Sequence, residues 1–176
     1  MKEISLIIAV TLAPLIWDRT VAAADLEHEC IRMTLPFTPT TDMNRGALIV
    51  VNASTPTAMT PLLIVAVLCS SPGDSKSDDV KAKIREKFIN DEATTKARCV
   101  DAVDERVIQH SATFTERRFA CMQSWSAEAG APNRGFAASS LIEFDGHLLI
   151  VAYVNTAPRP DAEKQFDLII GSLRSR

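Results

Sequence analysis

The sequence predicts an α+β protein in which an antiparallel sheet of about six strands has helices packed on its faces. Three observations favour this class. Apolar, β-branched runs such as residues 62–69 are typical of strands, the Asp145-Gly146 pair is typical of a tight hairpin turn, and two segments carry apolar stripes at helical spacing. Because hairpins join the later strands in place of long crossover connections, neighbouring strands should be antiparallel.

Composition indicates one ordinary globular domain. The chain has 176 residues, of which 47% are hydrophobic and 23% charged, so disordered, collagen-like and coiled-coil classes are excluded. A domain of this size can bury a substantial core. The formal net charge of −3 argues against nucleic acid or an anionic membrane as partner.

The first residues have the form of a secretory signal peptide. An apolar run at 4–17 is followed by small residues, among which Ala22 and Ala24 suit a cleavage site. The run is shorter than the roughly 20 residues of a spanning helix. We therefore expect a signal peptide at 1–24, a mature domain at 25–176 without a membrane span, and a periplasmic or secreted location.

Four cysteines follow the predicted signal, at Cys30, Cys69, Cys99 and Cys121. An even number in an exported chain predicts two disulfides. No two cysteines stand in a C-x-x-C motif, so neither a thioredoxin-like redox site nor a zinc knuckle is indicated. Four cysteines permit three pairings, and the sequence cannot choose among them. Our preference is Cys30 with Cys69 and Cys99 with Cys121.

The first half of the predicted domain contains two clear strands. Residues 25–45 are interpreted as a loop or short edge strand, because Pro36 and Pro39 interrupt regular structure. Ordered structure is expected to begin with strands at 46–53 and 62–69. Both runs are almost continuously apolar, which predicts a sheet covered on both faces.

An amphipathic helix should follow at Ser77. This residue is a suitable N-cap and acidic residues follow it. Val80, Ile84 and Phe88 then recur at i, i+4 and i+8 over roughly four turns. We expect this helix to cover one face of the sheet.

Two hairpins are expected next. The first joins strands at 105–115 and 118–126 through a turn at 116–117, a register that places Phe114 opposite Phe119.

The second hairpin joins residues 137–144 to residues 147–155 through Asp145-Gly146, whose residues tolerate the positive φ angles of a type I′ turn. Because both sides of its second strand are apolar, we expect that strand to be central.

A second helix should close the chain. Prolines at 158 and 160 precede Asp161, and an apolar stripe follows at the spacing i, i+3, i+4, i+7. The residues of the stripe are Phe166, Ile169, Ile170 and Leu173.

The order of the elements, and the closing run GHLLIVAYVNTAPRPDAEKQFDLIIGSLR at 146–174, resembles the PsbP-like superfamily of α/β/α sandwiches. The resemblance covers roughly residues 35–173 and rests on element order and hydrophobic pattern. It implies a binding or assembly factor, since members of that superfamily are mostly non-enzymatic. It carries no catalytic motif.

Two short motifs suggest chemistry. Glu27-His28-Glu29-Cys30 combines metal-binding atoms, but adjacent ligands rarely converge on one ion and no second His/Cys cluster is visible, so we expect no metal. Gly73-Asp74-Ser75 is similar to the nucleophile block of GDS-type esterases. Only His28, His110 or His147 could act as its base, and none lies in a matching motif. We interpret His110 as a hydrogen-bonded sheet histidine and His147 as exposed at a hairpin tip.

The connection at 125–135 is the candidate partner site. It begins with Trp125 and carries Arg134 near its end, and both residue types are favoured at interface hot spots. We therefore expect an exported binding or assembly module without a cofactor, whose partner is another envelope or extracellular protein or a small ligand. The alternative is a small secreted serine hydrolase that uses Ser75 with a histidine.

Overall fold

The α+β class is confirmed by the computed structural model, which contains ten strands and two helices in its described residues. The structure describes residues 24–39, 41–45, 48–52, 61–70, 75–125 and 133–176. The predicted signal peptide, apart from Ala24, lies outside the described residues. Neither helix among these residues is long and apolar enough to cross a membrane.

Strands dominate the chain order, and the two helices are far apart in sequence. The elements are β1 (Ala24–Glu27), β2 (Ile31–Leu35), β3 (Thr41–Arg45), β4 (Leu48–Asn52), β5 (Leu62–Leu68), α1 (Ser75–Lys96), β6 (Asp104–Ser111), β7 (Phe114–Trp125), β8 (Asn133–Phe144), β9 (His147–Asn155), α2 (Arg159–Gly171) and β10 (Arg174–Ser175).

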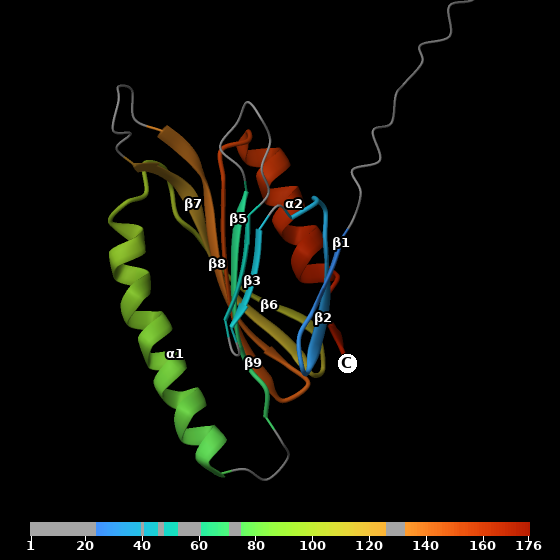
Figure 1. Ribbon diagram of the computed structural model, residues 1–176. Helices are drawn as coiled ribbons and strands as arrows, with labels where there is room; N and C mark the ends of the chain where they lie inside the picture. Colours follow the sequence, from blue (N-terminus) through green and yellow to red (C-terminus); the bar gives the residue numbers. More distant parts are fainter. Residues whose placement is uncertain (1–23, 40, 46–47, 53–60, 71–74, 126–132) are drawn as a thin grey trace, which may run out of the picture.

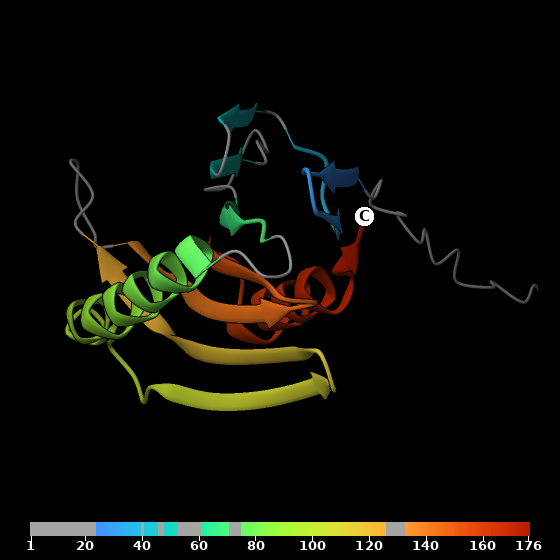
Figure 2. The ribbon, with the colours of Figure 1, turned by 90° about the horizontal axis from the view of Figure 1, so that it is seen from below.

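Seven strands form the main sheet, in the order β3-β4-β5-β9-β8-β7-β6, with every neighbouring pair antiparallel. Figure 2 shows this sheet from the blue-green β3 and β4 at one edge to the yellow-green β6 at the other. The predicted turn is confirmed, since Asp145 and Gly146 have φ angles of 48° and 83°. β9 lies at the centre of the sheet, as expected. The predicted count of about six strands in one sheet is wrong, because three further strands form a second sheet in the order β1-β2-β10.

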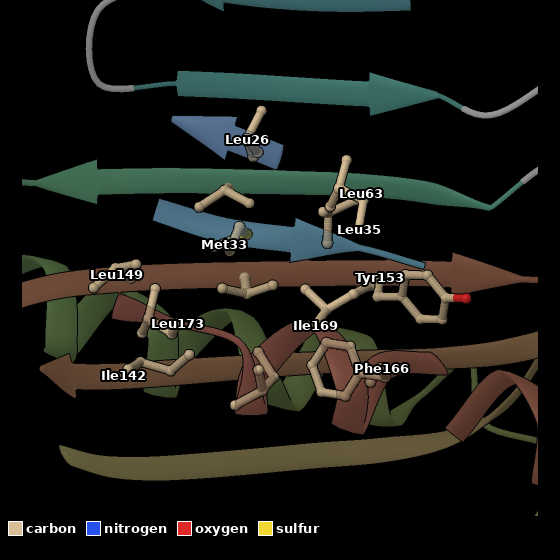
Figure 3. Packing of buried hydrophobic residues seen from close by; sticks show 14 of the residues in the cluster. Leu26, Met33, Leu35, Leu63, Ile142, Leu149, Tyr153, Phe166, Ile169 and Leu173 are labelled. Atoms are coloured by element: carbon tan, nitrogen blue, oxygen red, sulfur yellow. The ribbon is translucent and has the colours of Figure 1, made fainter. Parts of the chain in front are cut away.

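The larger hydrophobic core lies on one face of the main sheet, beneath α2 and the small sheet (Figure 3). The apolar stripe predicted for the last helix is confirmed, because Phe166, Ile169 and Ile170 are buried. The ring of Tyr153 from β9 stacks on Phe166 with centroids 5.6 Å apart. Met33 of the small sheet is buried in the same core.

The helix α1 lies on the opposite face of the main sheet from α2 (Figure 1). Phe88 is buried there against Leu141 and Leu148 and forms a second, smaller cluster. A helix therefore packs on each face of the sheet, as predicted. α1 is longer than expected and begins at Ser75, so Ser77 is not the N-cap. The Ser77 side chain is instead buried, and its hydroxyl lies 2.9 Å from that of Ser70.

Both favoured disulfides are present. Cys30–Cys69 joins the β1–β2 connection to the residue after β5, and therefore links the small sheet to the main sheet. Cys99–Cys121 joins the chain just after α1 to β7. Among the described residues there is no free cysteine.

The predicted β6–β7 turn is wrong. The chain reverses between Ser111 and Phe114, and Phe119 pairs with Glu105 instead of Phe114. The charged residues Glu116 and Arg118 were interpreted as marking the turn and the strand after it. They lie within β7, where they form a buried ion pair with each other, and this pairing offsets the cost of placing a charge in a core.

The interpretation of residues 25–45 also needs correction. The end of this region does form a short edge strand, β3 of the main sheet, but the region also contains the β1–β2 hairpin of the small sheet. Pro36 and Pro39 lie between β2 and β3, so they separate strands without preventing them. β2 shows the alternation of buried and exposed residues that is typical of a strand with one covered face.

Candidate functional site

The central strands of the main sheet present an apolar face that is only partly covered. The sequence predicted cover on both sides of residues 62–69, but burial alternates along β5. The side chains between its buried residues are only half-buried, and so are alternate side chains of the neighbouring strand β9. They are Leu62, Ile64, Ala66 and Leu68 of β5, and Ile150, Ala152 and Val154 of β9.

A groove of about 380 Å³ lies where α1 approaches this face, and we call it the α1 groove. Its lining is apolar except for one lysine. The lining residues are Ala66, Val67, Leu68, Val80, Ile84, Lys87, Leu148 and Ile150. Val80 remains 43% exposed although it belongs to the apolar stripe of the helix.

The groove follows from the narrow apolar stripe of α1. Only Phe88 of the predicted stripe is buried, whereas Ile84 is half-buried and Val80 is exposed. Positively charged residues such as Lys81 and Lys87 flank the stripe. The sequence contains the information that predicts such a groove, because one narrow apolar stripe on a helix cannot cover two adjacent strands that are apolar on both sides.

The groove has the size and the apolar lining of a small-molecule binding site. Its volume lies within the range of roughly 300–1,000 Å³ that is typical of small-molecule pockets. In the part of the chain that the structure describes, the lining contains no hydroxyl, thiol, carboxylate or imidazole side chain that could act as nucleophile or base. Lys87 can attract a negatively charged group at an otherwise apolar surface.

A second hollow, of about 270 Å³, is polar. Arg85 and Glu143 in its lining form an ion pair, with Nε and Oε1 2.8 Å apart. His147 also lines it and is half-buried, so its predicted exposure at the hairpin tip is wrong. Its Nδ1 accepts a hydrogen bond of 3.1 Å from the backbone N–H of Ser70. The neutral ring therefore carries its proton on Nε2, and that nitrogen cannot act as a base.

A cluster of charged side chains lies beneath α2 and is centred on Glu116, whose side chain is fully buried. Nε of Arg118 donates to Oε1 of Glu116 over 2.7 Å, and the Ser140 hydroxyl donates to the same oxygen over 2.5 Å. His110 places Nε2 2.8 Å from Oε2, which confirms the prediction of a hydrogen-bonded sheet histidine. Arg118 also donates to Asp167 of α2.

These contacts explain the ionisation of the cluster. Burial raises the pKa of Glu116, but the hydrogen bonds from Arg118 and Ser140 outweigh burial and hold the pKa below its ordinary value. Glu116 is therefore an anion whose two oxygens both have partners. Such a carboxylate stabilises packing and is poorly suited to accept a proton from a substrate.

The residues of the predicted partner site lie at the ends of two strands. Trp125 is the last residue of β7 and its side chain lies outside the described residues, as does the loop at 126–132. Arg134 is exposed and belongs to β8, where it pairs with Ser124. Their role in binding a partner stays a prediction.

The predicted hydrolase residues give no catalytic constellation among the described side chains. Ser75 is the first residue of α1, and its side chain lies outside the described residues. His110 is bonded to Glu116, and His28 is buried beside a disulfide.

Comparisons with known proteins add a partial structural similarity. No protein-family model matches this chain, and no curated protein is similar to it. A crystal structure from Bacteroides thetaiotaomicron VPI-5482, determined at 1.50 Å resolution, aligns with a TM-score of 0.46 and 10% sequence identity. The alignment covers 83% of this chain and 45% of that chain, so this chain spans less than half the length of the protein it matches.

Proposed function

We propose that this protein is an exported, non-enzymatic binding module that holds an aliphatic ligand with a negatively charged head group in the α1 groove. The observation that carries the proposal is the apolar lining of the groove with Lys87 as its charged member. An aliphatic chain would remove the remaining exposed area of these half-buried side chains from water, which contributes about 25 cal/mol per Å² of apolar area. Lys87 would attract the head group.

The location of the protein outside the cytoplasm is part of the proposal. The signal-like residues 1–24 and two disulfides both support export to an oxidising periplasm or exterior. Mass spectrometry of the exported protein should find its N-terminus at or near Asp25. The PsbP-like resemblance supports a non-enzymatic role, and helices on both faces of an antiparallel sheet are compatible with it.

Competition binding tests the groove. A fluorescent apolar dye bound to the protein should be displaced by dodecanoate. Val80→Asp should weaken dodecanoate binding by about tenfold or more, because it places a desolvated negative charge beside the ligand. Lys87→Gln should weaken binding of dodecanoate but not of neutral dodecanol.

Val107→Asp is the matched control, because Val107 is 74% exposed on β6 and does not line the groove. It should bind dodecanoate as the unchanged protein does. Equal affinity of Val80→Asp and Val107→Asp for dodecanoate would contradict the proposed site.

The same protein preparation tests the hydrolase alternative. A binding module should release no product from short-chain esters, and Ser75→Ala should leave dodecanoate affinity unchanged. Ester hydrolysis that disappears in Ser75→Ala would overturn the non-enzymatic assignment.

A further inference from the structure

We propose that His28, Cys30 and Cys69 form a redox-dependent site for a thiophilic metal ion of the Zn(II) class, available when the Cys30–Cys69 disulfide is reduced. The sequence argued against a metal because adjacent ligands rarely converge on one ion and no second His/Cys cluster was visible. The fold brings Cys69, 39 residues further along the chain, to the same place. Imidazole and two thiolates are ligands that zinc prefers in proteins.

The positions of the three ligand atoms suit one ion. Nδ1 of His28 lies 3.8 Å from Sγ of Cys69, and the three ligand atoms all lie within 4.8 Å of one another. Tetrahedral zinc, with bonds of about 2.1 Å to nitrogen and about 2.3 Å to sulfur, places such atoms roughly 3.6 Å apart. Small side-chain rotations after the sulfurs separate are therefore sufficient.

The backbone around the cluster is held by contacts other than the disulfide. The N–H of His28 donates to the carbonyl oxygen of Ile31 over 2.9 Å, which closes the β1–β2 connection. The carbonyl oxygen of Cys30 accepts a bond of 3.2 Å from the N–H of Arg176. Cys69 directly follows β5, which is paired with β9 along its length. The ligands should therefore stay near one another when the sulfur–sulfur bond opens.

The burial of His28 favours binding of a metal over free solvation of the reduced site. The residue is only 6% exposed, and the two cysteines pack against the larger core. Three protein ligands leave the fourth position of the ion for water.

The chemistry balances with a dithiol as reductant. The dithiol loses two electrons and two protons and becomes a disulfide, while the Cys30–Cys69 bond breaks to give two thiols. Binding of Zn(II) then releases both thiol protons and forms two zinc–sulfur bonds and one zinc–nitrogen bond. Disulfide and metal site are thus mutually exclusive states of the same cysteines.

The second disulfide provides an internal control. Among the described residues no other group of three histidine, cysteine or acidic side chains gathers its ligand atoms as His28, Cys30 and Cys69 do. Reduced Cys99 and Cys121 should therefore bind Zn(II) more weakly. A protein with Cys99→Ser and Cys121→Ser isolates the proposed site, and circular dichroism before and after reduction reports whether the fold persists.

The test is a Zn(II) titration in competition with a chromophoric chelator. It is made after the dithiol reductant has been removed under anaerobic conditions. The reduced Cys99→Ser/Cys121→Ser protein should bind about one Zn(II) per chain, and the oxidised protein should bind none at this site. His28→Gln should lower the affinity at least about tenfold, because even groups that only orient a metal ligand contribute 10–100-fold. His147→Gln should bind Zn(II) unchanged.

Two results would overturn the proposal. One is equal Zn(II) affinity of the reduced protein with and without His28→Gln. The other is loss of the fold on reduction that Zn(II) does not restore, since the site requires the β1–β2 connection and the end of β5 to stay together.

Discussion

A single backbone angle makes Gly146 hard to replace. Its φ of +83° lies in the region that side chains disfavour, yet a Cβ built there would meet nothing within 4 Å. Any cost of Gly146→Ala therefore arises from backbone strain and not from a collision. We expect the free energy of unfolding to fall by about 1–2 kcal/mol in urea denaturation.

Gly171→Ala is the control for Gly146→Ala. It also places a Cβ in open space, but its residue is the last of α2, where no positive φ is required. We expect a neutral or slightly stabilising effect. Equal destabilisation at both positions would show that φ is not the cause.

Replacement of Arg118 should be among the most destabilising single substitutions in the protein. Arg118→Met would leave Glu116 as a buried charge without its main partner, at a cost of about 3–5 kcal/mol in the free energy of unfolding. The same substitution at Arg106, which is half-exposed and paired with Asp104, should cost at most about 1 kcal/mol. Chemical denaturation of the two variants measures both losses. Similar losses in the free energy of unfolding would show that burial does not make the Arg118–Glu116 pair more important than an exposed pair.

Glu116 also predicts a pH dependence. Its pKa is lowered in the folded protein from the ordinary value of 4.5, so its stabilising effect is present above pH 4.5. As the pH falls below 4.5 toward the lowered pKa, the folded protein loses this contribution. Glu116→Gln should therefore show a weaker fall in stability with acidification, measured by urea denaturation at a series of pH values. If Glu116→Gln and the unchanged protein lost stability equally with falling pH, the lowered pKa of Glu116 would be contradicted.

At the scale of elements, α1 depends on a covalent link. The Cys99–Cys121 disulfide closes 22 residues and attaches the end of this helix to β7, while the α1 groove leaves the start of its apolar stripe exposed. Replacement of both cysteines by serine should lower the free energy of unfolding by about 3 kcal/mol. Amide hydrogen exchange should rise more in α1 than in β8 and β9. A uniform rise across these elements would argue against a local tether.

The strand β7 shows why element prediction failed where it did. The predicted turn was Glu116-Arg117, two charged residues of the kind that usually lie at the surface. In the fold Glu116 is instead buried beneath α2, where its charge is paired with that of Arg118. That pairing depends on contacts with β8 and α2, which local sequence does not contain. The β8–β9 turn was predicted because Asp145 and Gly146 themselves supply its backbone angles.

The whole molecule has two cores of unequal size on the two faces of one sheet. Phe166 is fully buried in the larger core, whereas Phe88 is 6% exposed in the small cluster under α1. Phe166→Ala should cost about 3–5 kcal/mol, and Phe88→Ala should cost less because its surroundings can relax toward the groove. Urea denaturation of both variants tests this asymmetry, and a larger cost at Phe88 would contradict it.

Local chemistry by itself determined much of this protein. The apolar run of β5, the turn at Asp145-Gly146 and the apolar stripe of α2 act over a few residues, so the sequence shows them directly. The even number of cysteines predicted two disulfides, whereas the choice among the three pairings was made by the fold.

Only the tertiary structure decided the places where function is proposed. The α1 groove exists because the side chains of one helix are too few to cover two strands from distant parts of the chain. The meeting of His28 with Cys69, and of Glu116 with Arg118 and Asp167, likewise depends on how sheets and helices pack. Burial and proximity are properties of the whole fold. They decide which of these groups are ionised or bonded more strongly than the adjacent residues in the sequence do.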